Sequence, residues 1–372
     1  MKSLLIFSPH FYPYVGGLES HVEEFAKHIS EHDFNVVIFT SRFATEAPPD
    51  EQRYKNVRII RYPAFQIVPN FPCPKFWSKE FWKQWSLIKK MKFDFQMTRT
   101  RFFLTSLLPF FYGRKKAKWI HVEHGSSYVQ LSNRLKNLIG FMYDNILGRL
   151  ILLTADEVVV ISKSVESFVT KFTNRPTHLI YRGMDLVKLD CTIKDQIKLD
   201  ESRIKIGVAC RLYKWKGVEN SINAVLSIPR NDIVFYIAGN GEDFAHLKEY
   251  ESDKIRLLGE LSRNEAISFL KKLDIYIHSS YAGGGLSCAL LEAMYCENVV
   301  IATPNEGANE VVNNGKTGIL VKESSEDAIK QGIEQVLLEK DKWPTYRENA
   351  HKFIGDNFIW NKAIERYLKI LV

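Results

Sequence analysis

Strand-like and helix-like segments alternate along almost the whole of this 372-residue chain, and this order restricts it to α/β folds. Short apolar runs such as Ser3–Phe7, Asn35–Thr40 and Ile233–Ala238 have the pattern of buried strands, and helical patterns follow them. Such a succession is typical of parallel sheets covered by helices. Because ligands bind parallel sheets at the carboxyl ends of the strands, the motifs that follow strands carry the functional prediction.

The alternation is interrupted once, by the polar and irregular stretch Arg182–Glu201. We therefore predict two doubly wound, Rossmann-like domains that face each other across a cleft. The N-terminal domain should span residues 1–182 and the C-terminal domain residues 183–356. The last helical segment, about residues 357–372, exceeds what the second domain needs, and we expect it to pack back onto the first.

Composition narrows the range of partners without selecting one. The formal net charge of +8 fits nucleotide phosphates, anionic lipid or nucleic acid, and equally a mildly basic enzyme without such a partner. We expect no nucleic acid, because no nucleic-acid-binding motif is present and the cations gather in one segment. Five cysteines without metal-like spacing favour a reducing, cytoplasmic location. The apolar N-terminal run is too short for a signal peptide, and no run approaches the ~20 residues of a membrane-spanning helix.

Residues 65–118 combine aromatic and basic side chains. Between residues 81 and 118 the only acid is Asp94, whereas ten residues there are lysine or arginine. This mixture suits an anionic membrane surface, where each basic residue contributes ~1 kcal/mol, and predicts peripheral binding at the inner face of the cell membrane. The alternative is a cationic surface over a partly buried aromatic cluster, because helical amphipathicity is unclear here. The aromatic residues concerned are Phe71, Phe76, Trp77, Phe81, Trp82 and Trp85.

Three consecutive glycines, residues 283–285, stand between the strand-like run Asp274–Ser280 and a helical run. Backbone amides at a helix N-terminus attract anions, and glycine lets a phosphate approach the backbone closely. Glu292, inside the first turns of that helix, can accept hydrogen bonds from ribose hydroxyls. Alone, such a turn is weak evidence, since many α/β turns need glycine for steric reasons. We expect a phosphate to lie against the backbone of Gly284, Gly285, Leu286, Ser287 and Cys288.

Two strand-end motifs of the first half also point to chemistry. Gly16-Gly17 opens a helix after the first strand, and its amides can hold a phosphate or a developing negative charge, although such glycine pairs are common. His124 follows the strand Lys118–Val122 and can reach a sugar hydroxyl or a leaving group. A buried, hydrogen-bonded histidine is the alternative interpretation of His124.

The second half contributes two more strand-end motifs. Arg211 and Lys216 stand five residues apart, where a guanidinium and an ammonium can clamp a diphosphate from two sides. The alternative is that both are ordinary surface cations. Gly239 follows the strand Ile233–Ala238 and either borders a nucleobase or ends the strand.

In this order the motifs resemble those of the GT-B retaining glycosyltransferases, specifically glycosyltransferase family 4, over essentially the whole chain. The resemblance rests on Gly16-Gly17, His124-Gly125, Arg211 with Lys216-Gly217, and Glu292 before Ala-Met. It implies the GT-B fold and sugar transfer from a nucleotide-diphosphate donor with retained anomeric configuration. It also implies that His124, Arg211 and Lys216 are catalytic. The donor-binding residues that it implies are Gly16, Gly17, Arg211, Lys216, Gly239, Gly284, Gly285, Leu286, Ser287, Cys288 and Glu292.

One position departs from the family pattern. The family carries a first glutamate, which holds donor-sugar hydroxyls, where this chain has Gly284. Glycine has no side chain to accept those hydrogen bonds, and losing such a charged contact costs ~1.5–3 kcal/mol unless another group replaces it. We expect either an unusual donor sugar or a substitute contact from Asn309 or Glu310.

The sequence therefore predicts a metal-independent, retaining glycosyltransferase that needs no cofactor, since no Asp-x-Asp motif is present. Arg211, Lys216 and the helix amides would neutralise the departing diphosphate. We expect a UDP sugar as donor and a glycan or glycolipid acceptor at the cytoplasmic membrane face, as in cell-surface polysaccharide synthesis. Two alternatives stay open: a nucleotide-sugar epimerase on the same scaffold, and a non-catalytic sugar-nucleotide-binding partner subunit.

Overall fold

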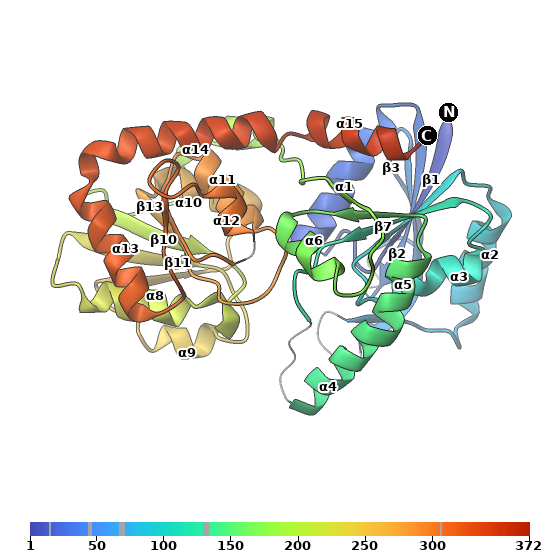
Figure 1. Cartoon of the computed structure of the whole chain (residues 1–372), viewed down its shortest axis with the longest axis horizontal. Helices are drawn as coiled ribbons and strands as arrows, with labels where there is room; N and C mark the ends of the chain where they lie inside the picture. Colours follow the sequence, from blue (N-terminus) through green and yellow to red (C-terminus); the bar gives the residue numbers. More distant parts are fainter. Residues whose placement is uncertain (15, 44–46, 67–70, 129–133, 306) are drawn as a thin grey trace. The chain divides into compact units, whose positions relative to one another are not determined.

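The computed structural model describes residues 1–14, 16–43, 47–66, 71–128, 134–305 and 307–372 (Figure 1). The chain divides into two compact units. Unit 1 comprises Met1–Gly183 and Trp360–Val372, and unit 2 comprises Met184–Ile359. Each unit has a mainly parallel sheet with helices between its strands, so the predicted α/β class is confirmed.

The sheet of unit 1 has the order β3-β4-β2-β1-β6-β7-β8-β9 in the described part of the chain, and β5 pairs with β4. All pairings are parallel except those of β3 and β5 with β4. The strand order reverses beside β1, so the switch point of this sheet lies where β1 and β6 end. The strands are β1 (Lys2–Ser8), β2 (Phe34–Arg42), β3 (Asp50–Tyr54), β4 (Val57–Gln66), β5 (Pro72–Pro74), β6 (Phe95–Arg99), β7 (Lys118–Glu123), β8 (Glu157–Val160) and β9 (Thr177–Leu179).

The C-terminal helix of the chain belongs to unit 1. The Trp360 indole N–H donates to Glu24 over 2.7 Å, and the Tyr367 ring packs 4.7 Å from that of Phe25 on α1. The last helix is therefore fixed to α1 by an indole hydrogen bond and ring packing. The helices of unit 1 are α1 (Gly17–Ser30), α2 (Lys79–Lys90), α3 (Leu108–Tyr112), α4 (Arg134–Tyr143), α5 (Arg149–Thr154), α6 (Lys163–Val169) and α15 (Trp360–Ile370), with a π-helical turn at Asp144–Gly148 between α4 and α5.

Helix α2 lies in the aromatic and basic segment, where the sequence showed no clear amphipathicity. It is amphipathic: Phe81, Trp85 and Ile88 point into the core of unit 1 at helical spacing. Trp77 and Trp82 remain exposed. The helical period was hidden because the exposed Trp82 stands between the buried Phe81 and Trp85, and the exposed Trp77 precedes the helix. The aromatic cluster is thus divided between core and surface.

Unit 2 has an all-parallel sheet in the order β12-β11-β10-β13-β14-β15. This is the doubly wound Rossmann order, with its switch point between β10 and β13. The strands are β10 (Ile204–Ala209), β11 (Ile233–Ala238), β12 (Ile255–Gly259), β13 (Ile275–His278), β14 (Val299–Ala302) and β15 (Ile319–Leu320). The helices are α7 (Leu186–Cys191), α8 (Val218–Ser227), α9 (Phe244–Lys248), α10 (Arg263–Lys272), α11 (Cys288–Tyr295), α12 (Ala308–Val311), α13 (Glu326–Leu338) and α14 (Trp343–Asn357).

The central strands of unit 2 are apolar throughout. Every residue of β11 and β14 is buried, because helices cover both faces of a parallel sheet. Local signals fix the helix starts: Ser262 and Glu265 form a reciprocal capping box at α10. Among the described residues no helix is both long and apolar enough to cross a bilayer.

Candidate active site

The predicted site residues fall into two sets, one in each unit. In unit 2 most of them follow the neighbouring strands β10 and β13, and Gly239 follows β11. The Ser279 hydroxyl donates to the Lys216 carbonyl over 2.9 Å, and the Tyr281 amide donates to the Trp215 carbonyl over 3.0 Å. These bonds join the loop after β10 to the loop after β13 at the switch point, where parallel sheets bind ligands.

Two glycines make this close approach of the loops possible. Gly283 has φ +108°, and a Cβ there would meet the Trp215 ring at 2.3 Å. Gly217 has φ +66°, and its Cβ would meet the Ser279 carbonyl oxygen at 2.3 Å. Both positions thus combine a left-handed backbone with no room for a side chain. The glycines bring the two loops into direct contact.

The two predicted cations differ in their surroundings. The Lys216 ammonium lies 4.3 Å from the centre of the Trp215 ring, a cation–π contact that orients it beside the glycine loop. Lys216 is half-buried at the end of a 3₁₀ turn, Lys214–Lys216. Arg211 is exposed just after β10. The packing of Lys216 against Trp215 therefore distinguishes it from an ordinary, fully exposed surface lysine.

The glycine loop leads directly into α11, as predicted. Ser287 is the N-cap residue, and its hydroxyl accepts a hydrogen bond from the Leu290 amide over 3.4 Å. On the other side, a Cβ on Gly307 would meet the Gly285 carbonyl oxygen at 2.7 Å. This contact brings the start of α12, with Asn309 and Glu310, close to the loop that contains Gly284.

Glu292 has a partner that sequence reasoning missed. The Arg263 guanidinium donates two hydrogen bonds to its carboxylate, over 2.6 and 2.7 Å, in a bidentate geometry. Arg263 is the first residue of α10, and 29 positions separate it from Glu292, so no local pattern signals the pair. A carboxylate has further lone pairs, and Glu292 therefore keeps the capacity to accept hydroxyl hydrogen bonds.

Steric constraints explain why a glycine stands at position 239. Its φ is +136°, and a Cβ there would overlap the Cys210 carbonyl oxygen at 1.8 Å. Its amide donates to the Gly259 carbonyl over 2.7 Å. The residue lets the end of β11 approach the end of β10, and its amide is already engaged within unit 2.

In unit 1, Gly16 and Gly17 stand at the start of α1. Gly16 is the N-cap residue in an extended conformation, and its carbonyl accepts from the Ser20 amide over 3.0 Å. Gly16 has no side chain, so it gives no side-chain cap, and in the described part of the chain no other side chain caps this 14-residue helix. The role in phosphate binding that the sequence assigns to these amides stays a prediction.

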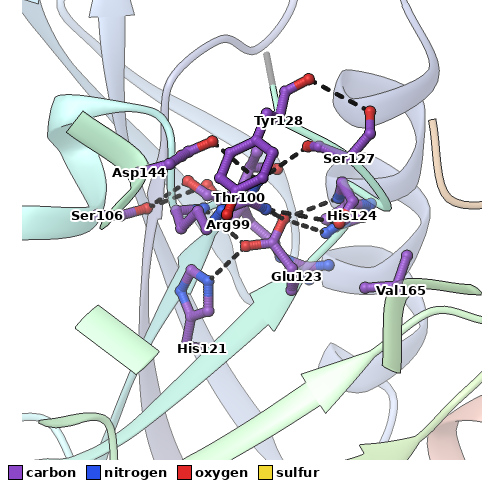
Figure 2. Close-up of polar contacts among 12 residues, drawn as sticks. Arg99, Thr100, Ser106, His121, Glu123, His124, Ser127, Tyr128, Asp144 and Val165 are labelled. Atoms are coloured by element: carbon purple, nitrogen blue, oxygen red, sulfur yellow. Dashed lines mark hydrogen bonds and ion pairs between the residues drawn. The ribbon is translucent and has the colours of Figure 1, made fainter. Parts of the chain in front are cut away.

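His124 lies directly after β7, and the Glu123 carboxylate holds its turn (Figure 2). One Glu123 oxygen accepts from the amides of His124 and Gly125 over 2.9 and 2.8 Å. The other accepts from the Arg101 amide over 3.1 Å, so Glu123 also fixes the turn after β6. The sequence motif contained Glu123, but nothing in it signalled that the side chain would turn back onto its own backbone.

A chain of hydrogen bonds reaches Glu123 through the sheet. The Trp119 indole donates to the Thr98 hydroxyl over 2.9 Å, and that hydroxyl donates to His121 Nδ1 over 2.8 Å. His121 Nε2 then donates to Glu123 over 3.3 Å. The Thr98 hydroxyl and the His121 ring each accept one hydrogen bond and donate one, which places the His121 proton on Nε2.

Arg101 supplies the charge that stabilises Glu123. Its guanidinium lies 3.1 Å from Glu123 and 3.1 Å from Asp144, and all three side chains are almost fully buried. Burial alone would raise the pKa of Glu123, but the Arg101 charge and the hydrogen bonds from His121 and the Gly125 amide hold it well below its usual value. The carboxylate is therefore ionised throughout the neutral and mildly acidic range.

The His124 ring lies in a basic environment. Its centre is 5.2 Å from that of His21, which accepts a hydrogen bond from the buried Arg99 guanidinium over 2.8 Å. Burial and the charge of Arg99 lower the pKa of His124 to about 3. Among the described residues, His124 Nε2 is buried without a hydrogen-bond partner. An unsatisfied polar atom of this kind is suited to a ligand hydroxyl. The alternative interpretation, a buried histidine that is hydrogen-bonded through its other ring nitrogen, stays open beside the catalytic prediction.

Family models match both halves of the chain. The model described as Glycosyltransferase Family 4 matches residues 15–188, and that described as Glycosyl transferases group 1 matches residues 191–353. An uncharacterized glycosyltransferase of Methanocaldococcus jannaschii is 42% identical over 385 residues, which cover 99% of this chain and 97% of that protein. One component of the phosphatidylinositol N-acetylglucosaminyltransferase of Homo sapiens is 24% identical over 396 residues, with coverage of 99% and 75%.

Solved structures agree on the fold. Sucrose-phosphate synthase from Thermosynechococcus elongatus superimposes with a TM-score of 0.82 at 19% identity, over 100% of this chain and 98% of that one. Anabaena HepE in complex with UDP and glucose gives 0.74 at 16% identity, over 100% and 99%. The two Rossmann-like units thus define a glycosyltransferase of the GT-B class. The chain belongs to glycosyltransferase family 4, as its motifs predicted.

Proposed function

We propose that this glycosyltransferase transfers a sugar from a UDP-sugar donor to a glycan or glycolipid acceptor at the cytoplasmic membrane face, with retained anomeric configuration and without a divalent metal. The proposed donor site rests on one observation: hydrogen bonds join the Lys214–Lys216 turn to the loop of residues 279–283 at the switch point. There the Lys216 ammonium and the Arg211 guanidinium can neutralise the diphosphate. The Leu286–Cys288 backbone at the start of α11 adds amide donors.

The proposed reaction breaks the bond between the anomeric carbon and the donor phosphate oxygen. The acceptor hydroxyl attacks from the same face, and its proton passes to the departing phosphate oxygen, so nucleoside diphosphate and the glycosylated acceptor are the products. His124 contributes as a neutral imidazole, because its pKa lies far below neutrality. Its Nε2 orients a hydroxyl of the donor sugar rather than carrying a charge. Gly16 and Gly17 supply the amides of α1 to the same reaction.

Two relatives support the choice of substrates. UDP is bound to Anabaena HepE, which shares the fold. The human relative bears a name that gives phosphatidylinositol, a phospholipid, as substrate. Both statements concern those proteins and not this chain. Among the substrates that the sequence left open, they favour a UDP-sugar donor and a lipid-linked acceptor.

Recognition of the donor sugar must differ from the family pattern at Gly284. We infer that Glu310 or Asn309 accepts the sugar hydroxyls, because the Gly307 turn brings both close to the glycine loop. Glu292, oriented by Arg263, accepts hydrogen bonds from the ribose hydroxyls. Glu310→Gln should therefore weaken binding of the UDP sugar and leave binding of UDP itself unchanged.

The donor half is tested by thermal shift with UDP, GDP and ADP, each with and without a chelator. A nucleotide at 100 times its dissociation constant adds ~2.7 kcal/mol to the free energy of unfolding. We expect UDP to stabilise the protein with chelator present, Lys216→Ala to abolish the shift, and the neighbouring exposed Lys214→Ala to preserve it. Absence of a shift with every nucleotide would contradict the proposal. Binding without turnover on any acceptor would favour the alternative of a partner subunit without catalysis.

A further inference from the structure

Helices α4 and α5 of unit 1 leave large apolar side chains in solvent. The exposed fractions range from 42% for Leu150 to 68% for Leu135. Figure 1 shows α4 extending away from the rest of unit 1. A group of this size on a single helical segment is uncommon on a soluble surface and marks an interaction site. The residues, called here the apolar stripe, are Leu135, Leu138, Ile139, Met142, Ile146, Leu150 and Leu153.

The spacing places these residues on one face. Successive members are mostly three or four residues apart, which keeps them within one side of a continuous helix. The opposite side packs into unit 1 through buried Asp144, Gly148 and Ile151, and Phe141 on that side, which is 45% exposed, lies 4.8 Å from the Tyr128 ring. The segment is therefore amphipathic in an unusual sense: one face is fixed to the protein and the other exposes leucine, isoleucine and methionine.

The charged side chains of residues 134–154 indicate which kind of partner the apolar stripe contacts. The single acid of this segment, Asp144, is fully buried and paired with Arg101. The described side chains between residues 135 and 154 therefore present no carboxylate to solvent, whereas the Arg149 guanidinium is exposed. An apolar face with an exposed cation and no exposed acid is complementary to anionic lipid headgroups over an acyl-chain layer.

The stripe is connected to the His124 turn by buried contacts. Asp144 opens the π-helical turn and binds Arg101, which binds Glu123, which holds the His124 amide. Gly148 in the same turn leaves room for Arg101, whose Cδ would lie 3.2 Å from a Cβ at this position. The helix that bears the stripe and the turn that bears His124 are thus held by one ion network.

From these observations we infer that the apolar stripe inserts into the interface of an anionic lipid bilayer and positions unit 1 on the membrane. The inference rests on the proposed function in that the acceptor is lipid-borne, and it names the surface that meets the lipid. It assigns the main contact to α4 and α5, whereas the sequence had pointed to residues 65–118. The membrane contact then lies on the element that anchors the His124 turn.

The test is flotation of the purified full chain with lipid vesicles, without nucleotide sugar. Vesicles are made of phosphatidylcholine alone and of phosphatidylcholine with phosphatidylglycerol. We expect the wild-type chain to bind the mixed vesicles. The double variant I139S/M142S should lower the bound-to-free ratio by about tenfold or more, since two apolar side chains no longer leave water. The conservative variant I139L/M142L should bind as the wild type does.

Two controls make the result specific. Leu338→Ser removes a leucine of α13 in unit 2 that is even more exposed, at 85%, and should not change vesicle binding. The variant W77S/W82S tests the aromatic and basic segment in the same way. Vesicle binding lost in W77S/W82S but kept in I139S/M142S would overturn the inference. So would a wild-type dimer in sedimentation that becomes monomeric in I139S/M142S while neither binds vesicles, since the stripe would then contact a second copy. Because no sugar transfer is measured, failure here is distinct from failure of the proposed function.

Discussion

The Arg101 guanidinium lies 3.1 Å from the same Glu123 oxygen that accepts the amide hydrogens of His124 and Gly125. One buried ion pair therefore stabilises the turn that places the His124 ring after β7. Breaking a buried pair by removing one partner costs ~3–5 kcal/mol, because the other charge is left without compensation. The pair is thus the structural basis for the position of His124 and a sensitive place to test the account.

Glu123→Gln removes the charge and keeps the shape. We expect the free energy of unfolding to fall by ~3 kcal/mol or more, since Arg101 then retains only Asp144 and the His124 turn loses its ionised acceptor. Urea unfolding measures the change. Glu157→Gln is the matched control, because Glu157 pairs with Lys118 and His178 near the surface, and its loss should cost less than ~1 kcal/mol. Equal losses in the two variants would show that the Glu123 network adds no special stability.

His21 and His124 predict a dependence of stability on pH. Burial and Arg99 lower both pKa values, to about 3 for His124, whereas an unfolded histidine titrates near 6.5. Below pH ~6.5 the unfolded chain therefore binds protons that the native chain does not. Stability is full above this value and falls as the pH drops, by up to ~1.4 kcal/mol per pH unit for each histidine.

The measurement is urea unfolding at several pH values between about 7.5 and 5, where these histidines begin to separate the two states. His124→Gln should flatten the acid-side decline, and the exposed His32→Gln should leave it unchanged. A decline that is the same in His124→Gln and wild type would mean that His124 titrates normally in the folded protein.

Arg263→Ala should act on nucleotide binding through Glu292. The guanidinium holds the Glu292 carboxylate with two hydrogen bonds. Without them, the Glu292 side chain is no longer held in the rotamer that ribose binding requires. We expect KM for the donor to rise about tenfold, in line with a charged hydrogen bond of ~1.5 kcal/mol, with little change in kcat. Arg256→Ala, which breaks an exposed pair with Asp253, is the control. A fall in kcat at constant KM would place Arg263 in the chemical step instead.

Gly283→Ala tests the union of the two donor loops. An alanine there must adopt φ +108° and would meet the Trp215 ring at 2.3 Å, so the loop has to shift. We expect a loss of ~2–4 kcal/mol in the free energy of unfolding, from the backbone cost and the overlap together, and a fall in donor binding. Gly315→Ala has φ +73° but nothing within 4 Å, and should show the backbone cost alone. Adding Trp215→Ala to Gly283→Ala should restore part of the stability, and no recovery would exclude the overlap as the cause.

Much of the fold follows from sequence, where local signals are strong. Strand β11 has the predicted bounds, Ile233–Ala238, because an apolar run that is buried throughout defines it. Strand β3, which pairs antiparallel with β4, was missed because its charged residues show no apolar alternation. Its register is instead supported by Arg53 and Tyr54, which both bind Glu23 on α1.

In the candidate site, too, some features could be predicted from local sequence and others could not. Glycine turns and strand-end cations were visible as local patterns, and the structure places the Lys216 and Gly283 loops in contact. The partners Arg263 of Glu292 and Asp144 of Arg101 were not visible, because 29 and 43 residues separate them and only the tertiary fold brings them together. Helical amphipathicity in α2 was hidden by the exposed Trp82, which stands between the buried Phe81 and Trp85.

The most direct test of the central claim is the initial rate of sugar transfer from a UDP sugar to a lipid-linked acceptor in the presence of a chelator. The account predicts transfer by the wild-type chain with retained anomeric configuration, a loss of at least about a hundredfold, or ~2.7 kcal/mol of transition-state stabilisation, in Lys216→Ala, and nearly full activity in Lys214→Ala. Equal activity of Lys216→Ala and the wild-type chain, or transfer that stops when divalent metal is removed, would contradict it.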